Sequence, residues 1–154
     1  MITFTVPGAP VPQGSMRHIG HGRMISDNPK LKAWRTTVNQ VFVYQHRCSK
    51  IEGPVEVRAV FVMPRPKSHY GTGRNTSRIK DAYLDIPHVV KPDGDKLIRA
   101  VFDALSTTKT QAGAFIDDSH VVRHSAQKRY VRPGEDPHAQ ITLSPAIGIH
   151  ETAA

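Results

Sequence analysis

The alternation of apolar and polar residues predicts several short strands. Residues 2–6 alternate strictly, which is typical of a half-buried strand. Residues 55–63 place every second side chain on one apolar face, so a longer strand is expected there. Further strands are predicted over residues 121–131 and 139–143.

A second pattern, with apolar residues three and four positions apart, predicts a first helix over residues 29–47. Its apolar positions are Leu31, Trp34, Val38, Val41 and Phe42. Asp27 or Asn28 is suited to cap this helix, and Pro29 fits its first turn.

The strongest helical pattern begins near Asp93 or Asp95 and ends near Leu105 or Ser106. The apolar face consists of Leu97, Ile98, Val101, Phe102 and Leu105. At about 100° per residue, Asp95, Lys96, Arg99 and Asp103 share the opposite face. This helix should therefore present charged side chains away from the core.

Two stretches lack any long periodic pattern. Residues 7–24 are rich in proline and glycine, so we expect an irregular loop. Residues 64–90 carry five basic side chains among prolines and glycines, with Tyr70 available for stacking; these are Arg65, Lys67, Arg74, Arg78 and Lys80. A loop of this length favours a role in gripping phosphates or unpaired bases, and the alternative is a solvated basic loop.

These elements predict an α+β fold, with a small mixed β-sheet and two main helices packed on one face. We expect a single domain over residues 1–145, followed by a flexible tail over residues 146–154. Strand order does not follow from the pattern.

Composition adds a preference for a polyanionic partner. The 154 residues carry a formal charge of +8, which favours nucleic acid over a membrane surface. Cys48 is the only cysteine, so no intrachain disulfide forms, and we interpret it as a small buried hydrophobe. No apolar run reaches membrane-spanning length, and we expect a cytoplasmic protein.

Four aspartates concentrate the candidate chemistry. Asp93 and Asp95 stand at the start of the second helix, where a single acid would be enough to cap it. Asp117 and Asp118 precede a strand; in an extended segment their side chains would point to opposite faces, and we expect Asp118 to face inward. The set of Asp93, Asp95 and Asp118 offers hard oxygen ligands, which suit Mg²⁺ or Mn²⁺ rather than zinc.

Other metal sites fit the sequence less well. A calcium-binding EF-hand loop lacks its later ligands after Asp95. A zinc site would use His18 with His21, or His120 with His124, but neither pair has cysteine partners. Among the histidines His120 is the best candidate for the site, because it follows Asp118 by two residues. A purely structural alternative has the acids capping helices and pairing with bases, for example Asp103 with Arg99.

Three segments together resemble the RusA family of Holliday-junction resolvases. They are Lys91-Pro-Asp-x-Asp, Leu97-Ile-x-Ala-Val-x-Asp-Ala-Leu105 and Asp117-Asp118-Ser-x-Val121. The resemblance is strong over residues 91–122, and residues 64–74 look like a basic insertion found in some members. It implies a RusA-like fold and a Mg²⁺-dependent, homodimeric endodeoxyribonuclease that acts on branched DNA, the four-way junction.

By position, the resemblance places the metal-binding aspartates at Asp93, Asp95 and Asp118, and a catalytic basic residue at Arg99. The family has lysine at that last position, and it usually has asparagine where this chain has Lys96. Arginine stays protonated and cannot act as a general base, so we expect Arg99 to stabilise charge. Lys96 and Lys128 join the five basic residues of 64–90 as candidate DNA contacts. Two alternatives remain open: a catalytically inactive branched-DNA-binding protein, and a nuclease that prefers flaps or forks.

Overall fold

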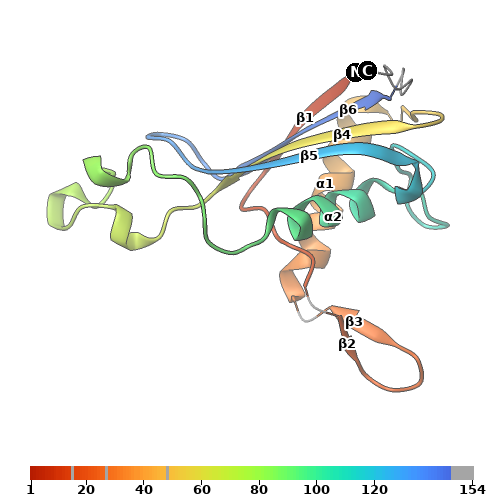
Figure 1. The fold of residues 1–154 in the computed structure, drawn as a ribbon, viewed down its shortest axis with the longest axis horizontal. Coiled ribbons are helices and arrows are strands. Elements are labelled where there is room, and N and C mark those ends of the chain that lie inside the picture. Colours follow the sequence, from red (N-terminus) through yellow and green to blue (C-terminus); the bar gives the residue numbers. More distant parts are fainter. Residues whose placement is uncertain (15, 27, 48, 147–154) are drawn as a thin grey trace, which may run out of the picture.

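The computed structural model describes residues 1–14, 16–26, 28–47 and 49–146. Its centre is a four-stranded sheet of β1 (Ile2–Pro7), β6 (His138–Pro145), β4 (Val55–Met63) and β5 (Val121–Tyr130), in that order. The two long helices, α1 (Pro29–His46) and α2 (Gly94–Leu105), cover one face of this sheet (Figure 1). The predicted α+β class is confirmed.

The sheet is mixed because the chain crosses over between β4 and β5. β6 pairs antiparallel with both β1 and β4, whereas β4 and β5 run parallel. A parallel pair requires a long connection, and residues 64–120 supply it. That crossover contains α2 and delivers residues of α2 and of the start of β5 to the same edge of the sheet.

The core lies between the sheet and the two helices. All five predicted inward residues of β4 are buried, from Val55 to Met63, together with Phe4 and Ile141 on the neighbouring strands. Helix α1 contributes the buried side chains of Leu31, Trp34, Val38 and Phe42, and Asn28 caps it by accepting a hydrogen bond from the Lys30 backbone N–H. Helix α2 buries its predicted apolar face except for Phe102, which is half-buried.

The prediction of an irregular loop over residues 7–24 is wrong in part, because a two-stranded hairpin begins within it. β2 (Met16–His18) pairs antiparallel with β3 (Met24–Ser26). The turn between them needs positive φ angles at Gly20 (89°) and Gly22 (72°), which glycine adopts without strain. The same glycines that obscure a strand pattern in the sequence therefore permit the hairpin.

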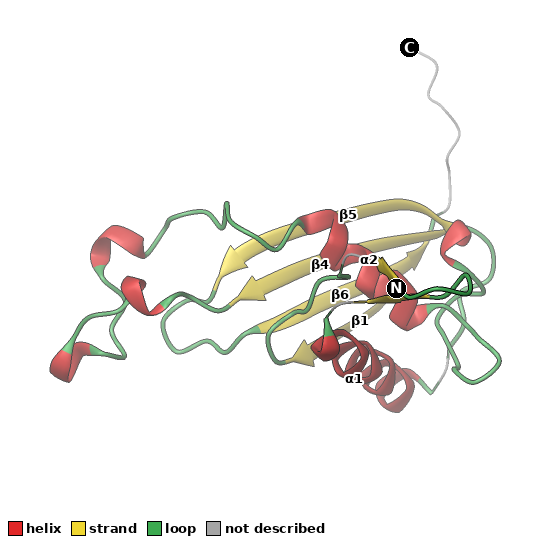
Figure 2. Cartoon of the chain, turned by 90° about the horizontal axis from the view of Figure 1, so that it is seen from below, coloured by secondary structure: helices red, strands yellow, loops and turns green. Residues whose placement is uncertain are grey.

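Residues 64–90, called the arm here, extend beyond the end of the sheet (Figures 1 and 2). As predicted, they contain no long element; three short 3₁₀ turns occur, at Lys67–His69, Gly73–Asn75 and Asp81–Tyr83. Rings hold the arm together: His69 stacks on Tyr83, with ring centroids 4.4 Å apart, and meets Tyr130 of β5 edge-on at 5.0 Å. The arm is thus an ordered extension attached to the sheet.

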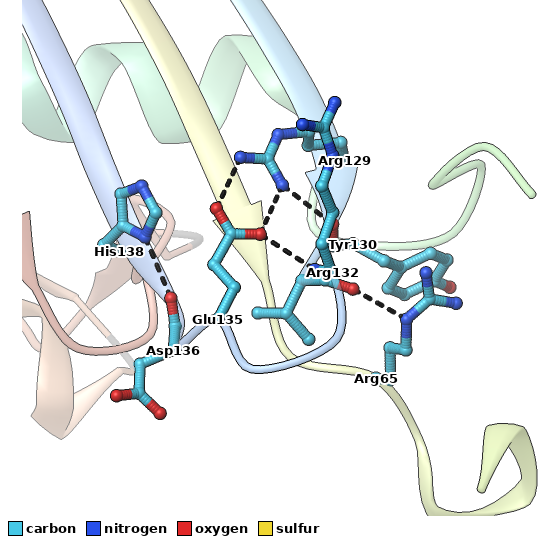
Figure 3. A network of polar contacts seen from close by, with 8 residues as sticks. Arg65, Arg129, Tyr130, Arg132, Glu135, Asp136 and His138 are labelled. Atoms are coloured by element: carbon cyan, nitrogen blue, oxygen red, sulfur yellow. Dashed lines mark hydrogen bonds and ion pairs between the residues drawn. The ribbon is translucent and has the colours of Figure 1, made fainter. Parts of the chain in front are cut away.

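The attachment uses polar contacts at the end of β5 (Figure 3). Arg65 donates from Nε to the Val131 carbonyl at 2.8 Å, and its guanidinium lies over the Tyr130 ring at 5.1 Å. Next to it, both terminal nitrogens of Arg129 donate to the Glu135 carboxylate at 2.6 Å. This bidentate pair holds the pKa of Glu135 at about 2 and closes the turn between β5 and β6.

Some predictions concern residues outside the described ranges: Asp27 as a cap, Cys48 as a buried residue, and all of the tail except Ala146. Ala146 itself is buried and donates its backbone N–H to the Pro54 carbonyl at 2.8 Å. Within the described ranges neither helix has the length and apolar character needed to cross a membrane.

Candidate active site

A cavity of about 530 Å³ opens between the exposed side of α2 and the start of β5. Three carboxylates line it, those of Asp95, Asp103 and Asp118, together with the guanidinium-bearing Arg99. Its remaining lining residues are Gln13, Ile98, Phe102, Val121 and His124. The cavity thus gathers negative side chains around a permanent positive charge.

Helix α2 positions three of these groups because they are spaced one turn apart along one face. Asp95 is in the first turn, where the positive end of the helix dipole favours a carboxylate. Arg99 and Asp103 follow at intervals of four residues. Three of the four residues of the predicted charged face of α2 therefore line the cavity.

Asp118 reaches the cavity from a turn, so the expectation of an extended Asp117–Asp118 segment is wrong. Asp118 begins the 3₁₀ turn Asp118–His120, and Asp117 caps that turn by accepting a hydrogen bond from the Ser119 backbone N–H at 2.9 Å. This hydrogen bond lowers the pKa of Asp117. Asp118 lines the cavity and Asp117 does not, which agrees with the predicted inward and outward roles.

The segment before Asp117 is fastened to the end of α2. Ala114 donates its backbone N–H to the Leu105 carbonyl at 2.7 Å, and the Gln111 side chain donates to the Ala104 carbonyl at 2.9 Å. A side chain at Gly113 would lie 2.3 Å from the Leu105 carbonyl oxygen, so only glycine fits there. These contacts fix Asp118 relative to the acids of α2.

Asp103 has the clearest electrostatic perturbation in the cavity. Burial raises its pKa, and the charge of nearby Asp118 acts in the same direction, while Arg35 and Arg99 oppose it. Its ion-pair partner is Arg35 of α1, at 3.5 Å, rather than the expected Arg99. Arg99 is exposed and forms no ion pair with a described residue, so it is available to a ligand in the cavity.

Asp93 is separated from the other acids in this conformation. It occupies the N-cap position of α2 without a side-chain hydrogen bond, and its carboxylate lies 3.7 Å from the Lys96 ammonium. Both side chains are about half exposed, so this pair contributes little stability and competes weakly with other partners. Asp93 and Lys96 line an adjoining hollow rather than the cavity itself.

The donor chemistry of the cavity fits a hard divalent cation such as Mg²⁺. Carboxylate oxygens are its preferred protein ligands, and the repulsion between Asp103 and Asp118 is the kind that a dication relieves. The described residues include no group of three acids, histidines or cysteines already gathered closely enough to hold a metal. The expected set of Asp93, Asp95 and Asp118 would therefore need side-chain movement, chiefly at Asp93.

Comparison with known families gives a decisive match. The family model of endodeoxyribonuclease RusA matches residues 7–144, nearly the whole chain. The chain belongs to the RusA family. RusA enzymes resolve Holliday junctions, so membership establishes an endonuclease class that acts on branched DNA. A search of the curated proteins finds no match.

The predicted DNA-binding residues of the arm fall into two groups. Arg65, Arg78 and Lys80 contact the arm itself: Arg65 donates to the carbonyls of Tyr83 and Leu84, and Lys80 donates to the Ser68 carbonyl at 3.0 Å. Arg78 lies 3.4 Å from the Asp81 carboxylate, and both side chains are largely exposed, so Arg78 remains accessible. Arg65 therefore stabilises the arm through these hydrogen bonds.

Lys67 and Arg74 are exposed, and neither forms a side-chain hydrogen bond or ion pair with another described residue. Lys67 lines a hollow of about 580 Å³ with Tyr70, the residue expected to stack on bases. These two cations, with Arg78, are the ones on the arm that best suit phosphate contacts.

Lys128 of β5 has a different position from the one expected of a DNA contact. Its ammonium donates to the carbonyls of Val90 and Pro92, at 3.0 and 2.8 Å. It therefore braces the backbone immediately before Asp93. A lysine that caps backbone carbonyls has no specific sequence pattern, which is why only its charge could be predicted.

Three polar residues that line the cavity, Gln13, Asp103 and His124, were not among the predicted site residues. Asp103 could have been found, since it lies eight residues after Asp95 on the same helical face. Gln13 and His124 come from a distant loop and from β5, so no local spacing indicates them. His120 was the histidine favoured for the site. Its Nδ1 instead lies 3.2 Å from the Gly53 carbonyl oxygen, and His120 is not among the residues that line the cavity.

Proposed function

We propose that this protein resolves four-way DNA junctions by metal-dependent hydrolysis of phosphodiesters, with the cavity between α2 and β5 as its active site. The observation that carries this proposal is the convergence of Asp95, Asp118 and Arg99 on one cavity, from two different segments of the chain. Family membership supplies the reaction class, and the cavity supplies groups suited to it.

Asp95 and Asp118 would hold Mg²⁺, or Mn²⁺, with Asp93 completing the set after leaving Lys96. When bound, the cation would lower the pKa of the attacking water and neutralise charge on the phosphate. Mg²⁺ keeps several water ligands, so two or three carboxylates are enough to retain it. Asp103, paired with Arg35, adds negative charge on the same side of the cavity.

Arg99 has the role of binding the phosphate opposite the acids. Its guanidinium stays charged at any working pH and presents several N–H donors to phosphate oxygens. Charge builds up on those oxygens in the transition state, so a fixed cation there stabilises the transition state more than the bound substrate. This role needs no proton transfer, so the replacement of the family lysine by arginine is compatible with activity.

A homodimer is proposed as the active form. Resolution requires one cut in each of two strands, and a two-fold axis would present two identical cavities to them. The arm then offers Lys67, Arg74 and Arg78 to the duplex beyond the cut. Contacts of this kind go to phosphates and position the DNA without reading its sequence.

The test is cleavage of a labelled immobile four-way junction against a linear duplex of the same sequence, with Mg²⁺ or EDTA. We expect paired nicks in the junction that require metal and are lost in Asp95→Asn. Tight junction binding without any cleavage would contradict the proposal. It would favour a binding protein in which Arg99 and Lys96 do not support hydrolysis.

A further inference from the structure

A second hollow, of about 400 Å³, adjoins the proposed active site on the other side of Gln13. Its walls are Pro10, Pro12, Met63 and Pro92, and its remaining lining residues are Gln13, Gly14, Lys91, Asp93 and Lys96. This volume falls within the range of small-ligand sites. No residue of these apolar walls has a role in the proposed hydrolysis.

The hollow is held in place from two sides. The Gln13 backbone N–H donates to the Lys96 carbonyl at 3.0 Å, which fixes the N-terminal loop against the first turn of α2. Opposite, the Lys128 ammonium holds the Pro92 carbonyl at 2.8 Å. Proline side chains are rigid, so the apolar walls do not collapse readily into the hollow.

The surroundings indicate what kind of group would enter. Lys91 is exposed and the Lys96 side chain is about half exposed, so both can reach phosphates. Asp95 is the residue before Lys96 and lines the active-site cavity, so the two sites are adjacent along the helix. Apolar walls with flanking cations match a nucleotide, with its flat base inside and its phosphate outside.

We propose that this hollow receives the nucleobase next to the scissile phosphate, turned out of its stack. The proposal rests on the proposed function and adds a reason for its preference for branched DNA. Turning a base out of continuous duplex costs unpairing and unstacking energy, and this cost falls where pairing is already disrupted, as at a branch point. A base at a branch point therefore enters the hollow more readily than a base within a continuous duplex.

The walls carry few hydrogen-bonding groups, so the hollow accepts a base by its flat face. Such contacts tolerate any sequence, because every base has an apolar face. The hollow would thus select for DNA structure more than for sequence, and Lys91 and Lys96 would hold the flanking phosphates in register with the cavity.

The experiment uses a four-way junction with 2-aminopurine beside the cleavage point, a base that brightens when it leaves the stack. Protein is added in EDTA to prevent metal-dependent cleavage. We expect fluorescence to rise for this junction but not for a junction labelled in the middle of one of its duplex branches. In Pro12→Glu, which adds a charge to the apolar wall, the rise should be lost, and junction preference over duplex should fall about tenfold.

Pro133→Glu is the matched control, since Pro133 is exposed in the turn between β5 and β6. As a second measurement on the unmodified protein, 4-thiothymine at the same position should photo-crosslink to residues 10–14 or to Met63. This measurement keeps the test valid even where Pro12→Glu fails to fold. An unchanged fluorescence on binding, the same rise in Pro12→Glu, or crosslinks only elsewhere would each overturn the proposal.

Cleavage in Mg²⁺ separates this proposal from the one on which it rests. Metal-dependent junction cleavage without a fluorescence rise would refute the base-binding proposal and leave the proposed hydrolysis intact. A fluorescence rise without cleavage would refute the proposed hydrolysis and support the hollow as a base site.

Discussion

A single substitution, Lys128→Met, tests whether Lys128 stabilises the fold or binds DNA. The ammonium donates to two backbone carbonyls, of Val90 and Pro92. Hydrogen bonds from a charged donor contribute about 1.5–3 kcal/mol each. Because Lys128 is only half-buried, solvent screening reduces these contributions, and we expect the two bonds together to account for about 2 kcal/mol of the free energy of unfolding.

For a domain of this size, that loss corresponds to a fall in Tm of about 4–8 °C, which circular dichroism detects. The salt dependence of junction binding should be unchanged, because a lysine occupied by carbonyls contacts no phosphate. Lys67→Met is the matched control: it should leave Tm unchanged and lower the slope of log K against log salt by about one. A Lys128→Met protein with the Tm of the unmodified protein and a smaller slope would refute the assignment.

Three further predictions follow from the contacts described above. Arg99→Ala should lower the single-turnover cleavage rate about 100- to 1000-fold, whereas Arg99→Lys should retain most of it; equal losses would contradict a charge-stabilising role. Arg65→Ala should speed hydrogen exchange throughout residues 64–90 without affecting the sheet, because three backbone carbonyls lose their donor; unchanged exchange would show that Arg65 does not stabilise the arm. Glu135→Gln should cost about 1–2 kcal/mol in urea unfolding at pH 7. Since Arg129 lowers the pKa of Glu135 from 4.5 to about 2, this difference should be complete above pH 5 and shrink as the pH falls toward 2; a constant difference would refute it.

The fold was largely predictable because its periodic segments are long. Helix α2 shows the reason: its apolar residues recur three and four positions apart and bury one face, and the charged face is then fixed by geometry. The hairpin of β2 and β3 was missed because its turn consists of glycines, which weaken any strand pattern. Asp118 was placed in the cavity for a reason that proved wrong, since a 3₁₀ turn rather than strand alternation directs it there.

The site was predictable only where its residues share one element. Asp95 and Arg99 follow from helical spacing, but the cavity also needs Gln13, from a loop 82 residues before Asp95 along the chain. The sequence likewise gives the charge of Arg65 and Lys128 but not their partners, because backbone carbonyls are present at every residue. Such contacts depend on how distant segments meet.

The central claim, that the cavity between α2 and β5 carries out hydrolysis, is tested most directly at Asp118. The measurement is the single-turnover rate of four-way-junction cleavage in Mg²⁺ at saturating protein, for the unmodified chain and for Asp118→Asn. Asp136→Asn, in the exposed β5–β6 turn, is the matched control. We predict a loss of at least about 100-fold in Asp118→Asn, with junction binding retained and the control unaffected. A rate within a few-fold of the unmodified protein would place the chemistry elsewhere and contradict the account.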